Sequence, residues 1–369
     1  MTKGPKLARK VLALTLILAA TFSGQPASAI IMPEPIPDYS NPENWSDEAL
    51  AAQTLFICSS APSLWATSSS VRRGIGGIAL VGRGASAKLK SQIAAIKKKA
   101  LHGISPVIAS DEEGGDVQRL RTAIYRLPSA TTMGGWSDTK VRATAKAYGL
   151  RMKKLGVDIA FSPVADLNIS GFFISRARRG FSSNPVTAGK KATAWAFGMR
   201  DAGVLPVLKH WPGHGRSVDT HAKPGVLPSL QKLEASDLKP FHYAIEQGIT
   251  SVMVGHLLVP GLTEPATPTS RSKAALTLLR NEIGPNGLII TDSLSMGGAT
   301  RGLHKDIPEA AIRSLEAGVD VALVCSGPKS LISRVAAAVT SGRLPRSMMI
   351  EKVKRILAYK RQLRVIIEP

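Results

Sequence analysis

Residues 205–215 read Leu-Pro-Val-Leu-Lys-His-Trp-Pro-Gly-His-Gly, an apolar run that changes abruptly into a polar segment with glycine and proline. A short apolar run of this kind is typical of a buried strand, and the proline and glycines after Trp211 predict a turn directly behind it. Lys209 and His210 end the predicted strand, so we expect their side chains on opposite sides, one binding a ligand and the other orienting a neighbour. A buried strand with polar residues at its carboxyl end favours an α/β protein with its site at that end.

The same pattern of an apolar run followed by a segment of helical period recurs along the chain. We predict eight strands, at 54–58, 77–81, 106–109, 158–162, 205–209, 251–255, 288–291 and 320–325. The predicted helices include 87–100, 139–155, 186–202, 233–247, 272–283, 308–317, 328–340 and 348–363. Eight parallel βα units are what a (β/α)8 TIM-type barrel requires, and polar residues follow several strands rather than one switch point. The sequence therefore predicts an α/β barrel with a single catalytic domain, and a doubly wound open sheet is the alternative.

The first 29 residues have the order of a secretory signal peptide, with basic residues, an apolar run and a small-residue cleavage site. These parts are Lys3, Lys6, Arg9 and Lys10, then 11–22, then Ala27-Ser28-Ala29. A transmembrane helix needs about 20 apolar residues, so the run is too short to be one. We expect a mature chain that starts near Ile30, an extended proline-rich lead-in over 30–50 and the barrel domain over 51–369. No cysteine lies near the cleavage site, so we expect no lipid anchor and a secreted or cell-wall-associated protein.

The net charge bears on the partners of the chain. It is +22, and without the four basic residues of the signal peptide it is +18. Such a surplus favours an anionic partner. Nucleic acid is disfavoured, because no nucleic-acid-binding motif is present and only 5% of the residues are aromatic. For an exported protein we expect an anionic cell-wall polymer, and a charge that serves only solubility is an equal alternative.

The sequence has two cysteines, Cys58 and Cys325. Outside the cytoplasm an even number permits a disulfide, but spacing alone does not decide it. Cys58 ends the first predicted strand and Cys325 the eighth, and closing a barrel makes these two strands neighbours. Two alternatives stay open: a disulfide across the seam, or two reduced core cysteines.

Chemically active side chains follow five of the predicted strands. In chain order they are Asp111-Glu112-Glu113 with Arg119, Asp166 with Arg178-Arg179, Lys209-His210 with His214, Asp219 and His221, His256, and Asp292. On a barrel these strand ends meet at one face, where polar ligands bind. No HExxH, paired CxxC or phosphate-binding glycine loop occurs in the sequence, so we expect no metal and no nucleotide cofactor.

Carboxylates and arginines at one site suit a sugar, because they bind hydroxyl groups with pairs of hydrogen bonds. Cleavage of a glycosidic bond needs a carboxylate at the anomeric carbon and a proton donor at the leaving oxygen. Asp292 suits the first role. His221 suits the second, because Asp219 two residues before it can orient the ring and stabilise its charged form.

Three motifs give the chain a family resemblance: DEEGGDVQR at 111–119, KHWPGHG at 209–215 followed by Asp219-Thr220-His221, and TDSLSM at 291–296. Together they resemble glycoside hydrolase family 3, and more narrowly its single-domain bacterial β-N-acetylglucosaminidases (β-hexosaminidases), over about Leu55 to Thr340. The resemblance implies a retaining exo-β-N-acetylglucosaminidase that acts on peptidoglycan fragments or related glycans. It also implies Asp292 as the nucleophile, His221 as acid/base and Asp219 as its partner. The residues implied to hold the terminal sugar are Asp111, Arg119, Arg179, Lys209 and His210.

The chain departs from the family pattern at two places. Ser293 stands where a second aspartate is common, and the loop from Gly215 to Asp219 is one residue shorter, so we expect altered loop closure and rate.

Each site residue also has a plainer interpretation. Asp292 could cap a helix, His221 could be a surface loop residue and Arg179 a solvated charge. His214 and His256 are expected to be structural hydrogen-bonding groups rather than metal ligands.

Two other functions compete with hydrolysis. A neutral histidine repels phosphate less than a carboxylate does, so the same site could serve a β-N-acetylglucosaminide phosphorylase. An exported location argues against that activity. A catalytically idle cell-wall-binding protein is the alternative of a different class, and the intact Asp292, Asp219 and His221 argue against it.

Overall fold

The computed structural model describes Met1 and residues 41–366, apart from 62–63, 65–66 and 101–102. The predicted signal peptide beyond Met1 and the first part of the predicted lead-in lie outside the described residues. Within the described part of the chain, no helix is both long and apolar enough to cross a membrane.

The protein has an α/β fold with mostly parallel sheets. The larger sheet has the order β13-β1-β2-β3-β6-β7 and the smaller one β12-β10-β8, with every pair parallel. Two isolated parallel bridges, Val164 with Lys209 and Ile290 with Val321, connect the two sheets. The strands are β1 (Leu55–Ser60), β2 (Gly77–Val81), β3 (Val107–Ser110), β6 (Ile159–Ala160), β7 (Leu205–Pro206), β8 (Leu208–Trp211), β10 (Ser251–Val254), β12 (Leu288–Thr291) and β13 (Ala322–Val324). Two short ladders add β4 (Glu112–Gly114) with β5 (Val117–Gln118), and β9 (Gly225–Val226) with β11 (Leu257–Leu258).

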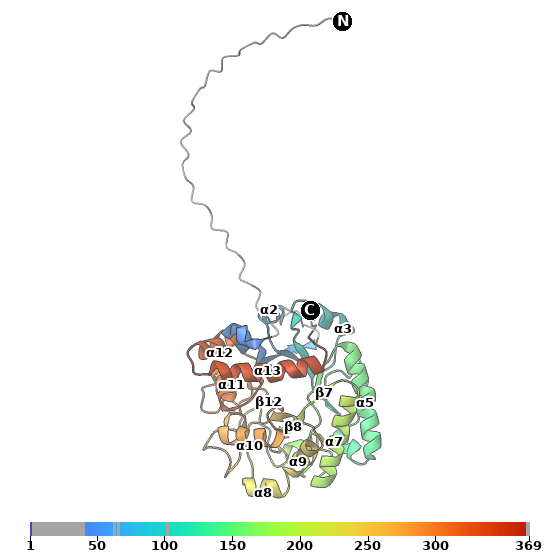
Figure 1. The fold of residues 1–369 in the computed structure, drawn as a ribbon. Helices are drawn as coiled ribbons and strands as arrows, with labels where there is room; N and C mark the ends of the chain where they lie inside the picture. The colour runs from blue at the N-terminus through green and yellow to red at the C-terminus, as the bar shows by residue number, and fades with distance from the viewer. Residues whose placement is uncertain (2–40, 62–63, 65–66, 101–102, 367–369) are drawn as a thin grey trace. The chain divides into compact units, whose positions relative to one another are not determined.

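Helices follow the strands and lie at the periphery, with β7, β8 and β12 between them (Figure 1). They are α1 (Asp47–Gln53), α2 (Ser68–Arg72), α3 (Leu89–Lys97), α4 (Ala130–Gly134), α5 (Asp138–Leu155), α6 (Phe173–Arg176), α7 (Pro185–Asp201), α8 (Leu230–Ala235), α9 (Lys239–Glu246), α10 (Lys273–Ile283), α11 (Ile307–Ala317), α12 (Leu331–Thr340) and α13 (Arg346–Gln362). Four of the longer ones, α5, α7, α10 and α11, begin where a side chain accepts a hydrogen bond from the first turn, at Ser137, Asn184, Ser272 and Asp306. Such caps explain why these helices start at those residues.

Both faces of the strands are buried, which explains their continuous apolar sequences. Along β2, Ile78 and Leu80 join the apolar cluster that includes the helices, whereas Ala79 joins a second cluster. The second cluster draws residues from both sheets, namely Phe56, Ala79, Val107, Ile159, Val207, Met253, Ile290 and Leu323.

Several boundaries differ from the prediction for local reasons. β2 and β12 have the predicted bounds, but the strand predicted at 205–209 is divided into β7 and β8. The helix predicted at 233–247 is divided into α8 and α9. Pro240 occupies the first turn of α9, where its missing N–H costs nothing, whereas inside one continuous helix it would remove a hydrogen bond.

The lead-in predicted as extended over 30–50 is partly helical where the structure describes it. A short 3-10 helix, η1 (Pro42–Asn44), precedes α1. Ser46 accepts a hydrogen bond from the Ala49 N–H, and Asp47 and Glu48 lie in the first turn. These residues start a helix for ordinary reasons of capping and dipole, so the prediction of an extended lead-in is wrong at 42–44 and 47–50.

Candidate active site

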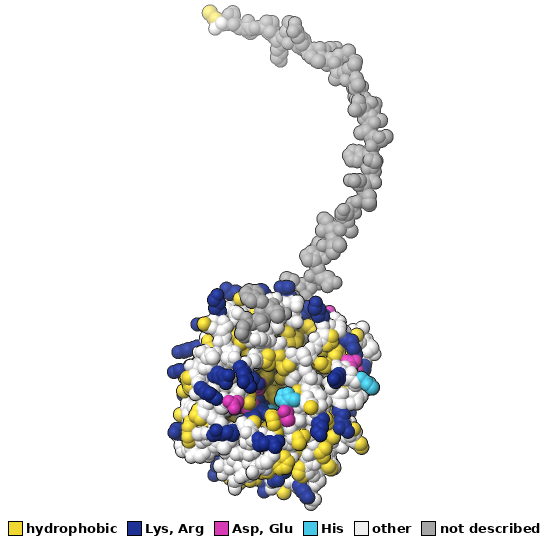
Figure 2. Space-filling model, turned by 180° about the vertical axis from the view of Figure 1, so that it is seen from behind, with side chains coloured by type: hydrophobic (Ala, Val, Ile, Leu, Met, Phe, Trp, Pro, Cys, Tyr) yellow, Lys and Arg dark blue, Asp and Glu magenta, His cyan; other side chains and the backbone are white. Residues whose placement is uncertain are grey.

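A pocket of about 330 Å³ lies at the carboxyl ends of the strands. Four predicted site residues line it: Asp111, Arg119, His221 and Asp292. The rest of its wall is largely apolar and includes Ala79, Val81, Phe161, Met253, Met296 and Leu323. Figure 2 shows a hollow on one face with histidine and acidic side chains beside it, and Lys and Arg side chains spread over the surrounding surface. An apolar wall with a few converging polar groups is typical of a small-ligand site.

Asp292 directly follows β12. Its Oδ1 accepts a hydrogen bond from the N–H of Ser293 at 2.7 Å. Burial raises the pKa of this carboxyl, but electrostatic interactions with His210, His256 and Lys209 and the Ser293 hydrogen bond outweigh that effect, and the pKa lies below its ordinary value. Asp292 is therefore ionised at neutral pH, the state in which a carboxylate can act as a nucleophile.

Asp292 does not cap a helix. The next helix along the chain is α11, and its cap is Asp306. The plainer interpretation of Asp292 as a helix cap is therefore wrong.

His221 and Asp219 form a pair on the loop after β8. The Nδ1 of His221 lies 2.5 Å from Oδ1 of Asp219, and the same oxygen accepts the backbone N–H of His221 at 3.0 Å. Burial raises the pKa of Asp219, but the hydrogen bonds from His221 lower it by more, so the pKa lies below its ordinary value. A carboxylate at Nδ1 favours the ring form with a proton there, which leaves Nε2 available to a ligand. The two side chains are 70% and 50% exposed, so the pair faces the solvent side of the pocket.

An ionic cluster lies deeper in the site. Asp111 accepts hydrogen bonds from Lys209 at 2.7 Å and from Arg119 at 3.1 Å. Lys209 also lies 2.6 Å from Glu113, and Arg179 donates two parallel hydrogen bonds to Glu113 at 2.7 and 2.8 Å. Such a bidentate pair fixes the guanidinium plane. Because its side chain is only 13% exposed, Arg179 is not the solvated charge of the plainer interpretation.

The protonation of Glu113 follows from these contacts. Burial raises its pKa, but Arg179 and Lys209 lower it more, to about 2. Replacing Glu113 by glutamine leaves buried Arg179 without its carboxylate partner and Lys209 with Asp111 alone, which we expect to cost roughly 3–5 kcal/mol of unfolding free energy at neutral pH. A carboxyl whose native pKa is depressed stabilises the fold above its unfolded pKa, and this contribution is lost as the pH falls through the native value.

Urea unfolding of wild type and Glu113→Gln between about pH 7 and pH 3 measures this contribution. The difference in unfolding free energy should shrink as the pH falls from about 4.5 towards 2. Glu264→Gln, at an exposed position, serves as the control. A difference that stayed constant with pH would mean that the charge of Glu113 does not hold Arg179 and Lys209.

His210 is oriented by a buried carboxylate. Its Nδ1 lies 2.7 Å from Oδ2 of Asp166, and its Nε2 lies 3.3 Å from the guanidinium of Arg179. The other oxygen of Asp166 accepts the backbone N–H groups of His210 and His214. Asp166 thus connects the ends of two strands.

The expectation that Lys209 and His210 lie on opposite sides is wrong, because both join the network around Arg179. The pairing of β8 with β10 shifts register between Met253 and Val254. Such an irregularity leaves one residue out of the regular alternation and redirects its side chain.

Glu113 and Asp166 were not assigned roles from the sequence, although both were among the side chains that follow predicted strands. Each is a carboxylate four residues after the end of a predicted strand. Their burial, with 4% exposure for Glu113 and none for Asp166, is visible only in the fold.

His256 has a structural role. Its Nε2 lies 2.9 Å from the carbonyl oxygen of Ser293, and its Nδ1 lies 2.8 Å from the hydroxyl of Ser270. Burial lowers the pKa of this histidine, so the ring is neutral, donates to the carbonyl and accepts from the hydroxyl. It thereby fixes the backbone next to Asp292. Among the described residues, no group of three or more His, Cys, Asp or Glu side chains is arranged to hold a metal ion.

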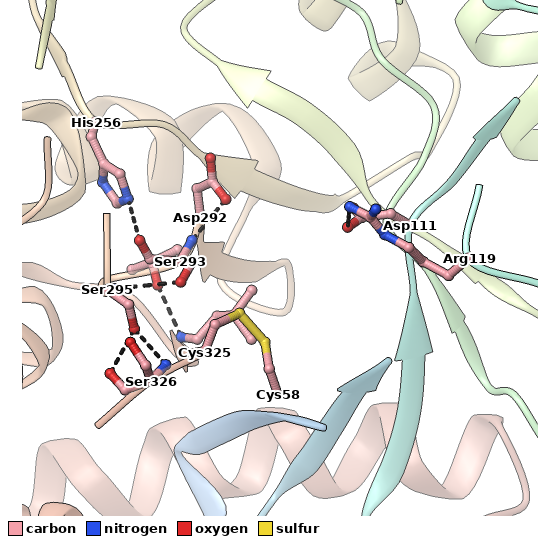
Figure 3. The surroundings of a disulfide bond; sticks show 11 residues. Cys58, Asp111, Arg119, His256, Asp292, Ser293, Ser295, Cys325 and Ser326 are labelled. Carbon is pink, nitrogen blue, oxygen red and sulfur yellow. Dashed lines mark hydrogen bonds and ion pairs between the residues drawn. A yellow bond between two sulfur atoms is a disulfide. The ribbon is translucent and has the colours of Figure 1, made fainter. Parts of the chain in front are cut away.

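Cys58 and Cys325 form a disulfide in the structure, with their Cα atoms 4.3 Å apart. β1 and β13 are paired neighbours, with Ile57 opposite Val324, so the register brings the two cysteines together. Both cysteines line the pocket. Figure 3 shows the bond close to the segment that follows Asp292, where the Ser295 hydroxyl exchanges hydrogen bonds with the backbone of Ser326.

An ionised carboxylate and a histidine–aspartate pair at one pocket suit the hydrolysis of glycosidic bonds, and comparison with known proteins agrees. The profile of the glycosyl hydrolase family 3 N-terminal domain matches residues 67–359. The enzyme is a glycoside hydrolase, and the chain belongs to glycosyl hydrolase family 3.

Individual relatives support this assignment. The chain is 40% identical over 263 residues to the beta-hexosaminidase LpqI of Mycobacterium tuberculosis, which covers 69% of this chain and 67% of that protein. A solved family 3 glycosyl hydrolase from Mycobacterium smegmatis is 32% identical, with a TM-score of 0.78 over 86% of this chain and 98% of the other. A β-N-acetylglucosaminidase from a Paenibacillus strain is 26% identical, with a TM-score of 0.79 over 87% of this chain and 63% of the other.

Proposed function

We propose that the enzyme is a retaining exo-β-N-acetylglucosaminidase. The observation that carries the proposal is that Asp292 and His221, from strand ends far apart in the sequence, line one pocket. Its relatives include proteins named beta-hexosaminidase and a solved β-N-acetylglucosaminidase.

In the first step, Asp292 attacks the anomeric carbon and forms a covalent glycosyl-enzyme. His221 protonates the leaving oxygen at the same time, and the carboxylate of Asp219 stabilises the positive charge on the ring before transfer. In the second step, neutral His221 takes a proton from water as the water attacks the anomeric carbon, which frees Asp292 and releases the sugar. A histidine here replaces the second carboxylate of the usual scheme.

The ionic cluster holds the terminal sugar in this proposal. Asp111 and Arg119 reach the pocket themselves. Lys209 is held by Asp111, His210 by Asp166 and Arg179 by Glu113, so these three contribute a fixed array of polar groups. Fixed donors bind a ligand with a smaller cost of reorganisation than mobile ones.

We propose further that the eight predicted strands close into a (β/α)8 barrel. Backbone hydrogen bonds across both seams support closure: Lys209 N–H donates to Pro163 and Thr291 N–H donates to Val321. The apolar cluster that contains Phe56, Met253 and Leu323 draws on strands from all sides, as the packed interior of such a barrel does. A crystal structure with pairing around the whole ring tests this point.

For its setting, we propose export by the predicted signal peptide, with cell-wall glycans as the source of substrate. The net charge of +18 that remains without the basic residues of the signal peptide supports attraction to an anionic cell wall.

Release of p-nitrophenol from its β-N-acetylglucosaminide tests the proposed activity. We expect turnover of this substrate, far less of the β-glucoside, and free N-acetylglucosamine as product even with added phosphate. Formation of a sugar 1-phosphate would instead show a phosphorylase. No turnover of either substrate would show an idle binding protein.

A further inference from the structure

The loop that carries the catalytic pair has a buried residue at its centre. Thr220 is 2% exposed, although it stands between the exposed Asp219 and His221. Its Oγ1 lies 3.1 Å from Nε2 of His214, a residue that is itself 3% exposed. Thr220 therefore points into the protein while its two neighbours point out.

His214 is a rigid partner for Thr220. Its backbone N–H donates to Asp166 at 2.7 Å, which ties it to the carboxylate that orients His210. Burial lowers the pKa of His214 to about 4, so the ring is neutral and carries one N–H. Within the described residues Nδ1 has no hydrogen-bond partner, and a buried donor is costlier to leave unpaired than an acceptor. The proton therefore belongs on Nε2, which donates to the Thr220 hydroxyl.

The other side of the loop contacts the segment that follows the proposed nucleophile. Gly297 N–H donates to the carbonyl oxygen of His221 at 2.7 Å, and Gly298 N–H donates to that of Thr220 at 3.2 Å. A Cβ added to Gly298 would lie 2.9 Å from the Thr220 oxygen, and one added to Gly297 would lie 2.2 Å from the Ala222 oxygen. Real Cβ atoms do not approach so closely, so this contact requires glycine at both positions.

We propose that Thr220 is a positioning residue for the reaction. Together with His214 and the Gly297-Gly298 pair, it holds the loop so that His221 faces the pocket of Asp292. The segment behind the nucleophile thus also supports the acid/base, and the two catalytic groups share one scaffold. This inference rests on the proposed function, because it assigns a role within that mechanism.

Activity measurements on two substitutions of Thr220 test the role. Thr220→Val keeps the shape of the side chain but removes the hydroxyl that accepts from His214, whereas Thr220→Ser keeps this hydroxyl. For a glycoside with a poor leaving group, we expect kcat/KM of Thr220→Val to fall about tenfold or more, since a lost buried hydrogen bond is of that size. The fall should be much smaller for an activated aryl glycoside, which leaves without protonation, and Thr220→Ser should stay near wild type.

Hydrogen exchange gives a readout that does not depend on activity. The amides of Gly297 and Gly298 donate to the loop, so they should be protected in wild type and exchange faster in Thr220→Val.

Gly298→Ala, which pushes against the loop from the other side, should also slow the glycoside with a poor leaving group more than the activated aryl glycoside. Gly135→Ala is the matched control, because a Cβ there meets only one atom at an ordinary 3.7 Å.

The outcomes separate this inference from the proposed function. A wild-type enzyme that fails to cleave the β-N-acetylglucosaminide overturns the proposed function. The positioning role alone is overturned if the wild type is active and Thr220→Val matches Thr220→Ser in two measurements. These are the ratio of kcat/KM between activated and poor leaving groups, and the hydrogen-exchange rates of the Gly297 and Gly298 amides. If Thr220→Val does not fold, Gly298→Ala decides: behaviour like Gly135→Ala would reject the role.

Discussion

Asp292→Ala is expected to lower kcat by at least about a thousandfold on every β-N-acetylglucosaminide, because the step that forms the covalent intermediate is removed. The fold should survive, since among the described residues the carboxylate accepts a single hydrogen bond, from the neighbouring Ser293 N–H. Initial rates with an aryl substrate measure the loss, and thermal unfolding verifies the fold.

Asp116→Ala is the matched control for this variant. Its carboxylate is 88% exposed and forms an ion pair with Arg126, itself 65% exposed. We expect wild-type rates from the control. Turnover by Asp292→Ala within tenfold of wild type would reject Asp292 as the nucleophile.

His221→Ala should give the second largest effect, and its size should depend on the leaving group. With a poor leaving group we expect a fall of about 10²–10⁴-fold, the usual contribution of general acid catalysis. An activated aryl glycoside leaves without a proton, so its first step should slow far less. Rates for a series of aryl glycosides with different phenol pKa values measure this dependence.

Asp219→Ala should show the same dependence with a smaller loss, because the histidine stays but loses the carboxylate at Nδ1. Val218→Ala, an exposed residue of the same loop, should behave like wild type. Equal slowing of good and poor leaving groups by His221→Ala would mean that this histidine is not the acid.

Much of the strand pattern was predictable because the strands are buried on both faces. A strand packed on two sides is apolar throughout, so it stands out even when it is short. The bounds of β2 and β12 were predicted for this reason. The division between α8 and α9 was not predicted, although Pro240 marks it, because residues 233–247 keep a helical period. Asp237 between the two helices meets its distant partner Arg216 only in the fold.

The sequence predicted which residues belong to the candidate site, but not which hydrogen bonds and ion pairs connect them. Asp111, Glu112 and Glu113 are three consecutive carboxylates that sequence alone does not distinguish. The hairpin of β4 and β5 separates them: Glu112 turns inward to the hydroxyl of Tyr148, whereas Glu113 pairs with Arg179. Local sequence carries no information about such distant partners. The same holds for the register shift that redirects His210.

The bond between Cys58 and Cys325 makes a covalent ring of almost the whole domain, since the two residues are 267 positions apart. The exposed loop with Asp219 and His221 lies inside this ring. A protease that cuts the loop opens the backbone, but the two fragments stay linked through the sulfur atoms. Cleaved enzyme should therefore migrate as one molecule on a denaturing gel until reductant is added. In a compartment shared with proteases, a single cut would leave the two halves of the enzyme tethered to each other.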